Sequence, residues 1–304
     1  MRLDAYLAKV YSGQSRSTWA KVIERGFVTV NGGVETSTKK QVSDKDKIVA
    51  DESYDKKIAT VDFPVIFEDD NVIVIDKPAG VLTHSKGALN EEFTVADYVA
   101  SLRAQRSNPA KSEKKPGLPR HSAPRNDREG IVHRLDRGTS GVIIGAKNEE
   151  TTKMLQRQFQ DRKTKKTYLA LVNITPTGRN TLDKNGENFT IDLPIGRNPK
   201  KPSQFKVDSK GKDAITDVKV VRVFENSTTL LELKPHTGRT HQLRVHLSYI
   251  GLPIVGDPVY GVAETASERM MLHASQLEIT IPDGQRKVFR AELPEGFDEK
   301  PNHK

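Results

Sequence analysis

Residues 133–146 read HRLDRGTSGVIIGA, in which a charged, glycine-containing part is followed by an apolar part. From Val142 onward the stretch is apolar and β-branched, which is typical of a buried strand. The part before Val142 combines charged side chains with two glycines that flank two hydroxyl residues, and this composition favours neither a strand nor a helix. We therefore expect a shaped loop that leads into a strand. The glycines permit a tight backbone path, and the hydroxyls can hydrogen-bond within the loop.

Asp136 is the candidate catalytic residue of this loop, because it stands between Arg134 and Arg137. Nearby positive charge favours the ionised form of a carboxyl group, which suits a nucleophile or a general base. The same charge pattern is equally compatible with an ion pair that only holds the loop together. Ser140 is a poor candidate for a hydrolase nucleophile, since Gly141 follows it directly and the Gly-x-Ser-x-Gly turn is absent.

A second dense signal is PHTGRTHQLRVHL at residues 235–247. Thr240 is a suitable N-cap for a helix that runs to Tyr249 and stops at Gly251. A basic, histidine-rich loop that leads into a helix favours a polyanionic substrate. The segment contains three histidines, His236, His241 and His246. We do not expect a metal site, because these histidines lack the i, i+4 pairing of a helical zinc site and no carboxylate lies within the segment.

The third signal is KKTYLALV at residues 165–172, where Tyr168 begins an apolar strand. A tyrosine at such a position is ordinarily part of the core. In a basic setting its ring can also stack on a nucleic-acid base. The sequence leaves both interpretations open.

The charge balance indicates a polyanionic partner. Lys and Arg number 49 against 40 Asp and Glu, which gives a formal net charge of +9 and a pI near 9.5. This balance favours nucleic-acid binding, although a generic basic protein can share it. The chain has no cysteine, which excludes disulfides, thiolate zinc sites and cysteine nucleophiles.

No membrane segment or secretory signal is predicted. The apolar stretches, such as those at residues 72–75 and 142–144, are far shorter than the roughly 20 residues that span a bilayer. The N-terminus lacks the apolar region that a signal peptide carries. We expect a cytoplasmic protein.

The length of 304 residues predicts more than one domain. Residues 1–50 form a small module of helical stretches followed by short strands, and residues 51–62 read as a linker. A larger domain follows over residues 63–295, with a tail at 296–304. Within it, residues 104–130 are rich in proline and basic residues and poor in large apolar side chains, which predicts a disordered insertion.

The order of elements predicts an α+β fold for the larger domain. Strands and helices are interspersed without regular βαβ alternation, which favours a mixed, largely antiparallel central sheet. The N-terminal module is predicted to be a small α/β domain, because its helical stretches precede strands joined at Asn31-Gly32, a typical hairpin turn.

Together these segments closely resemble the RluA family of RNA pseudouridine synthases. The resemblance rests on HRLDRGTSG, KKTYLALV and PHTGRTHQLRVHL in this order, preceded by FEDDNVIVIDKPAGVLTH and followed by GLPIVGDPVYG. The pattern SRSTWAKVIERGFVTVNG resembles the small alpha-L RNA-binding domain, of the S-four type, that several RNA-modifying enzymes carry. The resemblance implies the pseudouridine synthase fold and the isomerisation of specific uridines in structured RNA.

The resemblance also implies roles for single residues. Asp136 matches the family's essential aspartate, Arg244 the arginine that pairs with it, and Leu243 the apolar residue beside that arginine. Tyr168 matches the tyrosine that stacks on the target uracil. Arg134 is the candidate to fill the space that a flipped base vacates.

The remaining RNA contacts are expected from the second loop and the N-terminal module: Arg239, His241, Arg16, Lys21 and Arg25. The family's reaction requires no redox cofactor, nucleotide or metal, so no cofactor is expected here. The resemblance does not decide whether the aspartate attacks the anomeric carbon or the reaction passes through a glycal.

The expected partner is structured RNA, with large-subunit ribosomal RNA favoured and transfer RNA as the alternative. We expect a monomer that needs no protein partner. A competing hypothesis is a noncatalytic RNA-binding or ribosome-assembly protein, in which Asp136 and Arg244 form only a structural ion pair. A third hypothesis, an RNA hydrolase that uses His133 or His241, lacks a paired base and acid at recognisable spacing.

Overall fold

The computed structural model describes residues 1–11, 15–51, 61–85, 92–107, 130–225, 227–262, 267 and 269–297. They fall into two compact units, one made of Met1–Asp62 and His84–Glu129 and the other of Phe63–Thr83 and Gly130–Lys304. Most of the expected linker and tail lies outside the described residues. The domain boundaries expected from the sequence stay a prediction.

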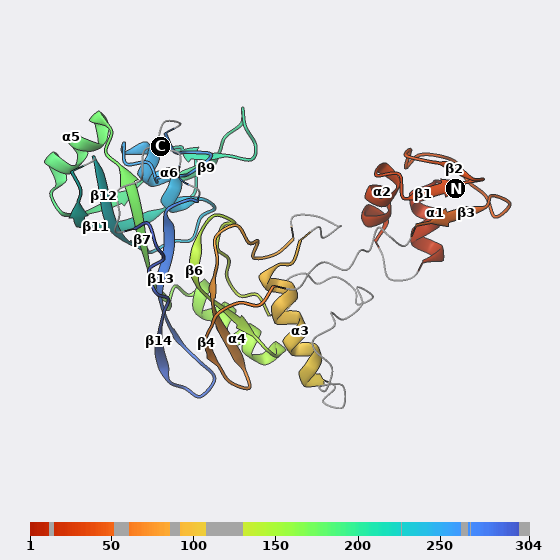
Figure 1. The fold of residues 1–304 in the computed structure, drawn as a ribbon, viewed down its shortest axis with the longest axis horizontal. Coiled ribbons are helices and arrows are strands. Elements are labelled where there is room, and N and C mark those ends of the chain that lie inside the picture. The colour runs from red at the N-terminus through yellow and green to blue at the C-terminus, as the bar shows by residue number, and fades with distance from the viewer. Residues whose placement is uncertain are drawn as a thin grey trace. The chain divides into compact units, whose positions relative to one another are not determined.

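The first unit begins with a small α/β module (Figure 1). It contains the helices α1 (Leu3–Val10) and α2 (Arg16–Glu24) and a three-stranded antiparallel sheet of β1 (Val28–Val30), β2 (Gly33–Val34) and β3 (Ile48–Ala50). The helices and the sheet bury one shared apolar core: Leu3, Leu7, Trp19, Val22, Ile23, Val28 and Val42. The expected N-terminal α/β module is therefore present.

Local sequence chemistry sets the start of α2 and the turn after β1. The hydroxyl oxygen of Ser15 accepts a hydrogen bond from the backbone N–H of Thr18, as an N-cap does. Asn31 and Gly32 have φ angles of 54° and 84°, the positive values that a two-residue hairpin turn requires.

The first unit also contains α3 (Val95–Ser107). Thr94 and Asp97 form a capping box, because each side chain accepts a hydrogen bond from the backbone N–H of the other residue. The expected start of the disordered insertion at residue 104 is wrong, since residues 104–107 continue this helix. Once a helix is nucleated, each further residue adds a hydrogen bond, so it can continue into a stretch whose sequence lacks an apolar pattern. Residues 108–129 lie outside the described part of the chain.

The second unit is built on one nine-stranded sheet (Figure 1). Its strands are, in spatial order, β4 (Val65–Glu68), β5 (Val72–Lys77), β6 (Ser140–Ala146), β13 (Leu272–Thr280), β7 (Lys165–Asn173), β12 (Thr228–Pro235), β11 (Ile215–Val223) and β8 (Asn188–Asp192). The ninth strand, β14 (Arg286–Arg290), pairs with β13. All neighbours in this sheet are antiparallel except β6 and β13, which run parallel. The expected α+β fold with a mixed, largely antiparallel sheet is confirmed.

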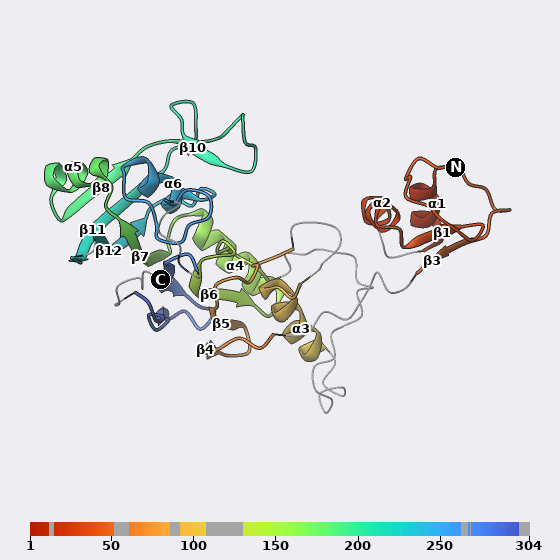
Figure 2. The ribbon, with the colours of Figure 1, turned by 45° about the horizontal axis from the view of Figure 1, so that its top comes forward.

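Three helices and a hairpin complete the second unit. The helix α4 (Glu149–Gln160) lies along β6 (Figure 2), α5 (Pro176–Asn185) follows β7, and α6 (Gln242–Tyr249) follows β12. The short strands β9 (Ile195–Arg197) and β10 (Phe205–Val207) pair in a separate antiparallel ribbon.

Two apolar clusters hold the sheet and its helices together. One joins β5, β6, β13 and α4, and the other joins β7, β12 and α6. Leu243 and Leu247 anchor α6 in the second cluster. The residues that lead into α6 are therefore held at the end of β12.

The helix expected after residue 240 begins differently from the prediction. It starts at Gln242, and the residue before it, His241, lies in the left-handed region with φ of 57° and makes no side-chain cap. The Oε1 of Gln242 accepts hydrogen bonds from the N–H of Arg239 and the hydroxyl of Thr237. This side chain, rather than Thr240, holds the turn, and the predicted cap is wrong.

Candidate functional site

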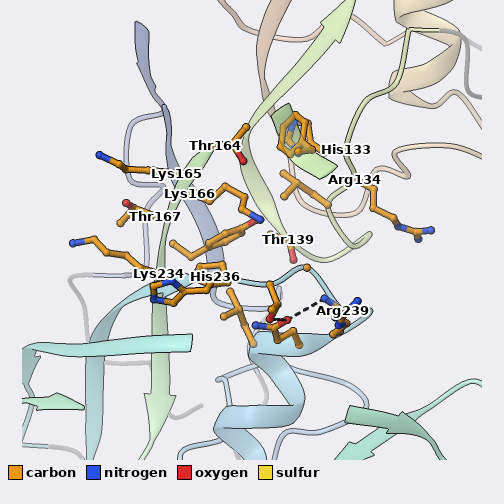
Figure 3. Close-up of a pocket in the computed structure, with 18 of the residues that line it drawn as sticks. His133, Arg134, Thr139, Thr164, Lys165, Lys166, Thr167, Lys234, His236 and Arg239 are labelled. Atoms are coloured by element: carbon orange, nitrogen blue, oxygen red, sulfur yellow. Dashed lines mark hydrogen bonds between the residues drawn. The ribbon is translucent and has the colours of Figure 1, made fainter. Parts of the chain in front are cut away.

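The three sequence signals converge on one cleft of the second unit (Figure 3). The cleft has a volume of about 1220 Å³ and is lined by the loop before β6, the start of β7 and the segment between β12 and α6. The sheet brings these distant segments together because β6 and β7 both pair with β13. Four residues expected at the site line the cleft: Asp136, Tyr168, Leu243 and Arg244.

The loop that carries Asp136 is fixed on both sides by the chain that follows β5. The hydroxyl of Thr83 donates to the carbonyl of Leu135 at 2.8 Å and accepts from its N–H at 3.1 Å. The N–H of Gly80 donates to the carbonyl of Arg137 at 2.8 Å. The backbone before and after Asp136 is therefore held in place.

Lys77 is a fully buried lysine that contacts this loop and that sequence reasoning missed. Its Nζ donates to the carbonyl oxygens of Pro78, Val81 and Arg137 at 2.9, 2.8 and 3.3 Å. These contacts occupy the three N–H groups of an ammonium. Burial lowers the pKa of Lys77 to about 7, while the negative charge of Asp136 favours its charged form. A lysine at the end of an apolar strand was the available signal.

The carboxylate of Asp136 is held through one of its two oxygens. Oδ2 accepts a hydrogen bond from Nη1 of Arg244 at 3.1 Å, and Nε2 of His241 lies 3.9 Å from the same oxygen. Among the described residues, Oδ1 has no hydrogen-bond partner. The side chain is 20% exposed and lines the cleft, so it remains accessible to a bound molecule.

Arg244 is the centre of a buried ionic network. Its Nε and Nη2 donate to the two carboxylate oxygens of Asp257 at 2.7 and 2.8 Å, and the Asp257 side chain is fully buried. Oδ1 of Asp257 also accepts from the N–H groups of Val259 and Tyr260. Burial alone would raise the pKa of Asp257, but the hydrogen bonds and charge of Arg244 outweigh it and hold that pKa below its ordinary value. Arg244 is thus oriented toward Asp136 by a partner on its other side.

Tyr168 and Leu243 form an apolar wall of the cleft. Tyr168 comes from β7 and Leu243 from the first turn of α6, and both belong to the packing of one core cluster. Burial, reinforced by the charge of Asp136, raises the pKa of the Tyr168 phenol above its ordinary value. Lys166 lies two positions earlier on the same face of β7 and also lines the cleft (Figure 3). The wall therefore combines an aromatic surface with a neighbouring amine.

Three of the residues expected to bind RNA also line the cleft: Arg134, Arg239 and His241. The guanidinium of Arg239 is tethered by its Nε, which donates to the carbonyl of Asp213 at 2.8 Å. Other basic side chains line the same cleft: Arg162, Lys165, Lys166, Lys234 and His236. The cleft is therefore suited to a negatively charged ligand.

The basic residues expected to bind RNA from the N-terminal module lie in the first unit. Arg16 begins α2, and its Nε donates to Oδ2 of Asp4 at 3.0 Å. Lys21 lies on the same helix and Arg25 is its C-cap. Their contacts with RNA stay a prediction.

His133 ties the loop to the sheet and is poorly placed for hydrolysis. Its Nε2 accepts a hydrogen bond from the N–H of Ile144 at 3.1 Å, and its ring stacks on Phe159 with centroids 4.6 Å apart. Burial lowers the pKa of His133 to about 3, so it is neutral at pH 7. A ring nitrogen that is already occupied does not serve as a general base. The hypothesis of an RNA hydrolase that uses His133 therefore gains no support.

Gly141 lets β6 pass close to β13, and its replacement tests this packing. Its φ is 110°, and a Cβ there would overlap the backbone oxygen of Ala274. We expect Gly141→Ala to destabilise the second unit by about 3 kcal/mol or more, because both the backbone and the neighbouring strand must move. Thermal unfolding followed by circular dichroism measures this loss.

Gly284→Ala is the matched control for that substitution. Gly284 also has a positive φ, 81°, but a Cβ there would meet no atom within 4 Å. Only the conformational cost of about 1 kcal/mol is expected. Equal losses of stability in the two variants would contradict the close approach of the strands.

Neither a membrane helix nor a metal cluster is found in the described part of the chain. No helix there combines the length and apolarity needed to cross a bilayer. The same residues contain no group of three or more His, Cys, Asp or Glu side chains placed to hold a metal ion.

Two family profiles match the chain. The profile described as RNA pseudouridylate synthase matches residues 71–249, which include the cleft's three sequence signals. The profile of the S4 domain matches residues 1–48. The two matches together span the N-terminal module and most of the sheet.

Relatives and a solved structure agree with these matches. The chain is 34% identical to a ribosomal large subunit pseudouridine synthase D of Borreliella burgdorferi, over 98% of this chain and 87% of the relative. It is 36% identical to the protein of the same name from Nitrosomonas europaea, over 97% of this chain and 82% of the relative. The structure of human RNA pseudouridylate synthase domain containing 1 superposes with a TM-score of 0.56 at 26% identity, covering 76% of this chain and 83% of that one.

These matches favour an enzyme over a noncatalytic RNA-binding protein, and they agree with the resemblance carried by the motifs. The chain belongs to the RluA-type RNA pseudouridylate synthases and is an isomerase that acts on RNA.

Proposed function

We propose that this pseudouridine synthase modifies large-subunit ribosomal RNA and that Asp136 is the carboxylate that acts on the ribose. The substrate is supported by the relatives from B. burgdorferi and N. europaea, whose names specify the ribosomal large subunit. The role of Asp136 rests on one observation. Arg244 holds its Oδ2, while Oδ1 has no hydrogen-bond partner among the described residues and the side chain lines the cleft.

The reaction exchanges one bond to the ribose for another. The bond between uracil N1 and ribose C1′ breaks, the base turns, and C5 becomes bonded to C1′. C5 loses its proton and N1 gains one, so the product is an isomer of the substrate. The site must therefore supply a group that acts at the ribose and a surface that retains the detached base, and it must exclude water.

Asp136 supplies the group that acts at the ribose. A carboxylate can attack C1′ directly, or it can assist elimination to a glycal, and both routes require it to lie beside the sugar. Arg244 sets that position, since Asp257 fixes the guanidinium from the other side. A carboxylate oriented in this way has little reorganisation to undergo when the substrate binds.

Tyr168 and Leu243 supply the surface that retains the base. The Tyr168 ring offers a face on which uracil can stack, and Leu243 closes the wall with apolar surface. The raised pKa of Tyr168 keeps its phenol protonated at neutral pH. The ring therefore brings no negative charge next to Asp136.

The basic side chains of the cleft offset the cost of exposing the target base. A uridine must leave its stack to reach Asp136, which costs a few kcal/mol and least in loops. Contacts between phosphates and residues such as Arg134 and Arg239 compensate for this cost and make affinity depend on salt. Arg16, Lys21 and Arg25 of the S4 domain supply further phosphate contacts. With ribosomal RNA as substrate, the protein works in the cytoplasm as a monomer.

The release of tritium from RNA labelled at C5 of uracil tests this function. Purified protein, without added metal or nucleotide, is expected to release tritium from large-subunit ribosomal RNA transcripts. Total transfer RNA serves as the competing substrate. Release from transfer RNA alone would overturn the ribosomal assignment, and release from neither RNA would contradict the proposed substrate classes.

A further inference from the structure

A chain of polar contacts leads from β10 to Asp136. The backbone N–H of Phe205 donates to the hydroxyl oxygen of Tyr260 at 2.8 Å. That hydroxyl lies 2.9 Å from Nδ1 of His241, and Nε2 of His241 lies 3.9 Å from Oδ2 of Asp136. The mechanism described above uses neither Tyr260 nor the tautomer of His241.

The two ends of this series of contacts, Phe205 and Asp136, determine which atom donates in each hydrogen bond. A backbone N–H can only donate, so Phe205 occupies one lone pair of the Tyr260 oxygen. If His241 carried its proton on Nδ1, a bare Nε2 lone pair would face the Asp136 carboxylate. The repulsion is avoided when Tyr260 donates to Nδ1 and the proton of His241 sits on Nε2.

Burial favours a neutral His241 ring and a protonated Tyr260 hydroxyl. Burial lowers the pKa of His241, against the opposing charge of Asp136, so the imidazole is neutral near pH 7 and its tautomer matters. Burial also raises the pKa of Tyr260, so its hydroxyl keeps the proton that it donates.

Tyr260 is held by Asp257, which also holds Arg244, and His241 packs against Tyr260. The N–H of Tyr260 donates to Oδ1 of Asp257, and the Arg244 guanidinium lies over the Tyr260 ring at 5.0 Å from its centroid. His241 packs edge-on against Tyr260 and has a left-handed backbone with φ of 57°. A non-glycine residue in that region costs free energy and persists only where its surroundings fix it.

We propose that His241 and Tyr260 are positioning residues for Asp136. Tyr260, together with the charge of Asp136, sets the tautomer of His241, and the Nε2–H of His241 becomes a second donor to Oδ2 when RNA fills the cleft. The present separation of 3.9 Å exceeds a hydrogen bond, and a movement of about 1 Å closes it. With Arg244 and His241 both on Oδ2, the carboxylate presents Oδ1 to the ribose. The inference rests on the proposed role of Asp136.

Nitrogen-15 NMR of protein labelled at histidine tests the tautomer without any activity measurement. The His241 signals are assigned by their absence from the spectrum of His241→Asn. We expect Nε2 to be protonated and Nδ1 bare near pH 7. In Tyr260→Phe the two ring nitrogens should shift part of the way toward averaged values, because only the charge of Asp136 then favours the proton on Nε2. A proton on Nδ1 in the wild type, or an unchanged spectrum in Tyr260→Phe, would overturn the proposal.

Two substitutions at residue 241 separate the donor to Asp136 from the contact with Tyr260. His241→Gln keeps an N–H group near the position of Nε2, whereas His241→Asn keeps only a polar group near Nδ1. Asn is also well tolerated in a left-handed backbone, so this variant is expected to fold. We expect single-turnover tritium release to fall about 100-fold in His241→Asn and no more than about 10-fold in His241→Gln.

RNA affinity distinguishes positioning from phosphate binding at this residue. The dissociation constant for RNA, measured by filter binding, should change less than about 3-fold in both variants, because a positioning residue acts on the rate rather than on binding. A weaker affinity with an unchanged single-turnover rate would instead make His241 a phosphate contact. If wild type is inactive on every RNA while the Nε2 proton is confirmed, the proposed substrate fails and the tautomer assignment stands.

Discussion

Asp136→Asn is expected to lower single-turnover tritium release by about 10⁴-fold or more while leaving RNA binding intact. The amide has the same shape as the carboxylate, and its oxygen can still accept from Nη1 of Arg244. It can neither attack the ribose nor serve as a base. Loss of the rate without loss of the fold would therefore locate the chemistry in the carboxylate. Filter binding and thermal unfolding measure RNA affinity and stability.

Asp217→Asn provides the matched control for that substitution. Asp217 is a second carboxylate that lines the cleft, where it pairs with His236 at 2.6 Å, and its side chain is 45% exposed. The proposed mechanism gives it no role, so its replacement should leave the rate within about 3-fold of wild type. Retained activity in Asp136→Asn, or equal losses in the two variants, would remove Asp136 from its proposed role.

Asp257→Asn is expected to reduce both stability and rate. The substitution leaves the buried guanidinium of Arg244 without its bidentate partner, and breaking a buried ion pair in this way costs about 3–5 kcal/mol. The freed guanidinium also stops orienting Asp136, so tritium release should fall about 100-fold. Glu149→Gln, which removes an exposed pair with Lys153, should cost less than about 1 kcal/mol.

The position of the chain's single tryptophan makes this stability measurement specific. Trp19 is buried in the core of the N-terminal module, whereas Asp257 lies in the other unit. The unfolding midpoint from tryptophan fluorescence should therefore stay unchanged, while the midpoint from circular dichroism of the large sheet should fall. A shift in both midpoints would indicate a general loss of folding rather than a local broken ion pair.

The stability contribution of Asp257 should also change with pH, in a direction that its pKa defines. The pKa of Asp257 lies below its ordinary value in the folded protein, so its stabilising contribution is present above about pH 4 and is lost as the pH falls through the folded value. Asp257→Asn should flatten the dependence of stability on pH in this range. An unchanged slope would mean that Arg244 does not stabilise the charged form of Asp257.

The sequence predicted the residues that line the cleft better than the buried residues that hold them in place. Asp136, Tyr168 and Arg244 stand in motifs with unusual composition, and the structure places all three in one cleft. Their roles in the reaction remain predictions. Lys77 and Asp257 were missed because the role of each depends on its burial and its partners, which tertiary packing creates.

The sequence also predicted the ends of individual helices less well. Thr240 is a good capping residue, but the side chain of Gln242 reaches back to Arg239 and takes over that function. Residues 104–107 lack the apolar pattern of a helix, yet they continue one that begins with a capping box at Thr94. At the start of α6, a contact made by a neighbouring residue thus outweighed the preference of Thr240 itself.

The parallel pairing of β6 with β13 also sets the order in which the enzyme can mature. Ser140 at the start of β6 hydrogen-bonds to His273 of β13, 133 positions later in the sequence. β7 pairs with the same strand, so neither wall of the cleft has its neighbouring strand until β13 has been synthesised. The S4 domain precedes all of these residues, and its core is formed by residues between 3 and 50. During translation the S4 domain can thus fold before the cleft does, and contacts of such long range form slowly.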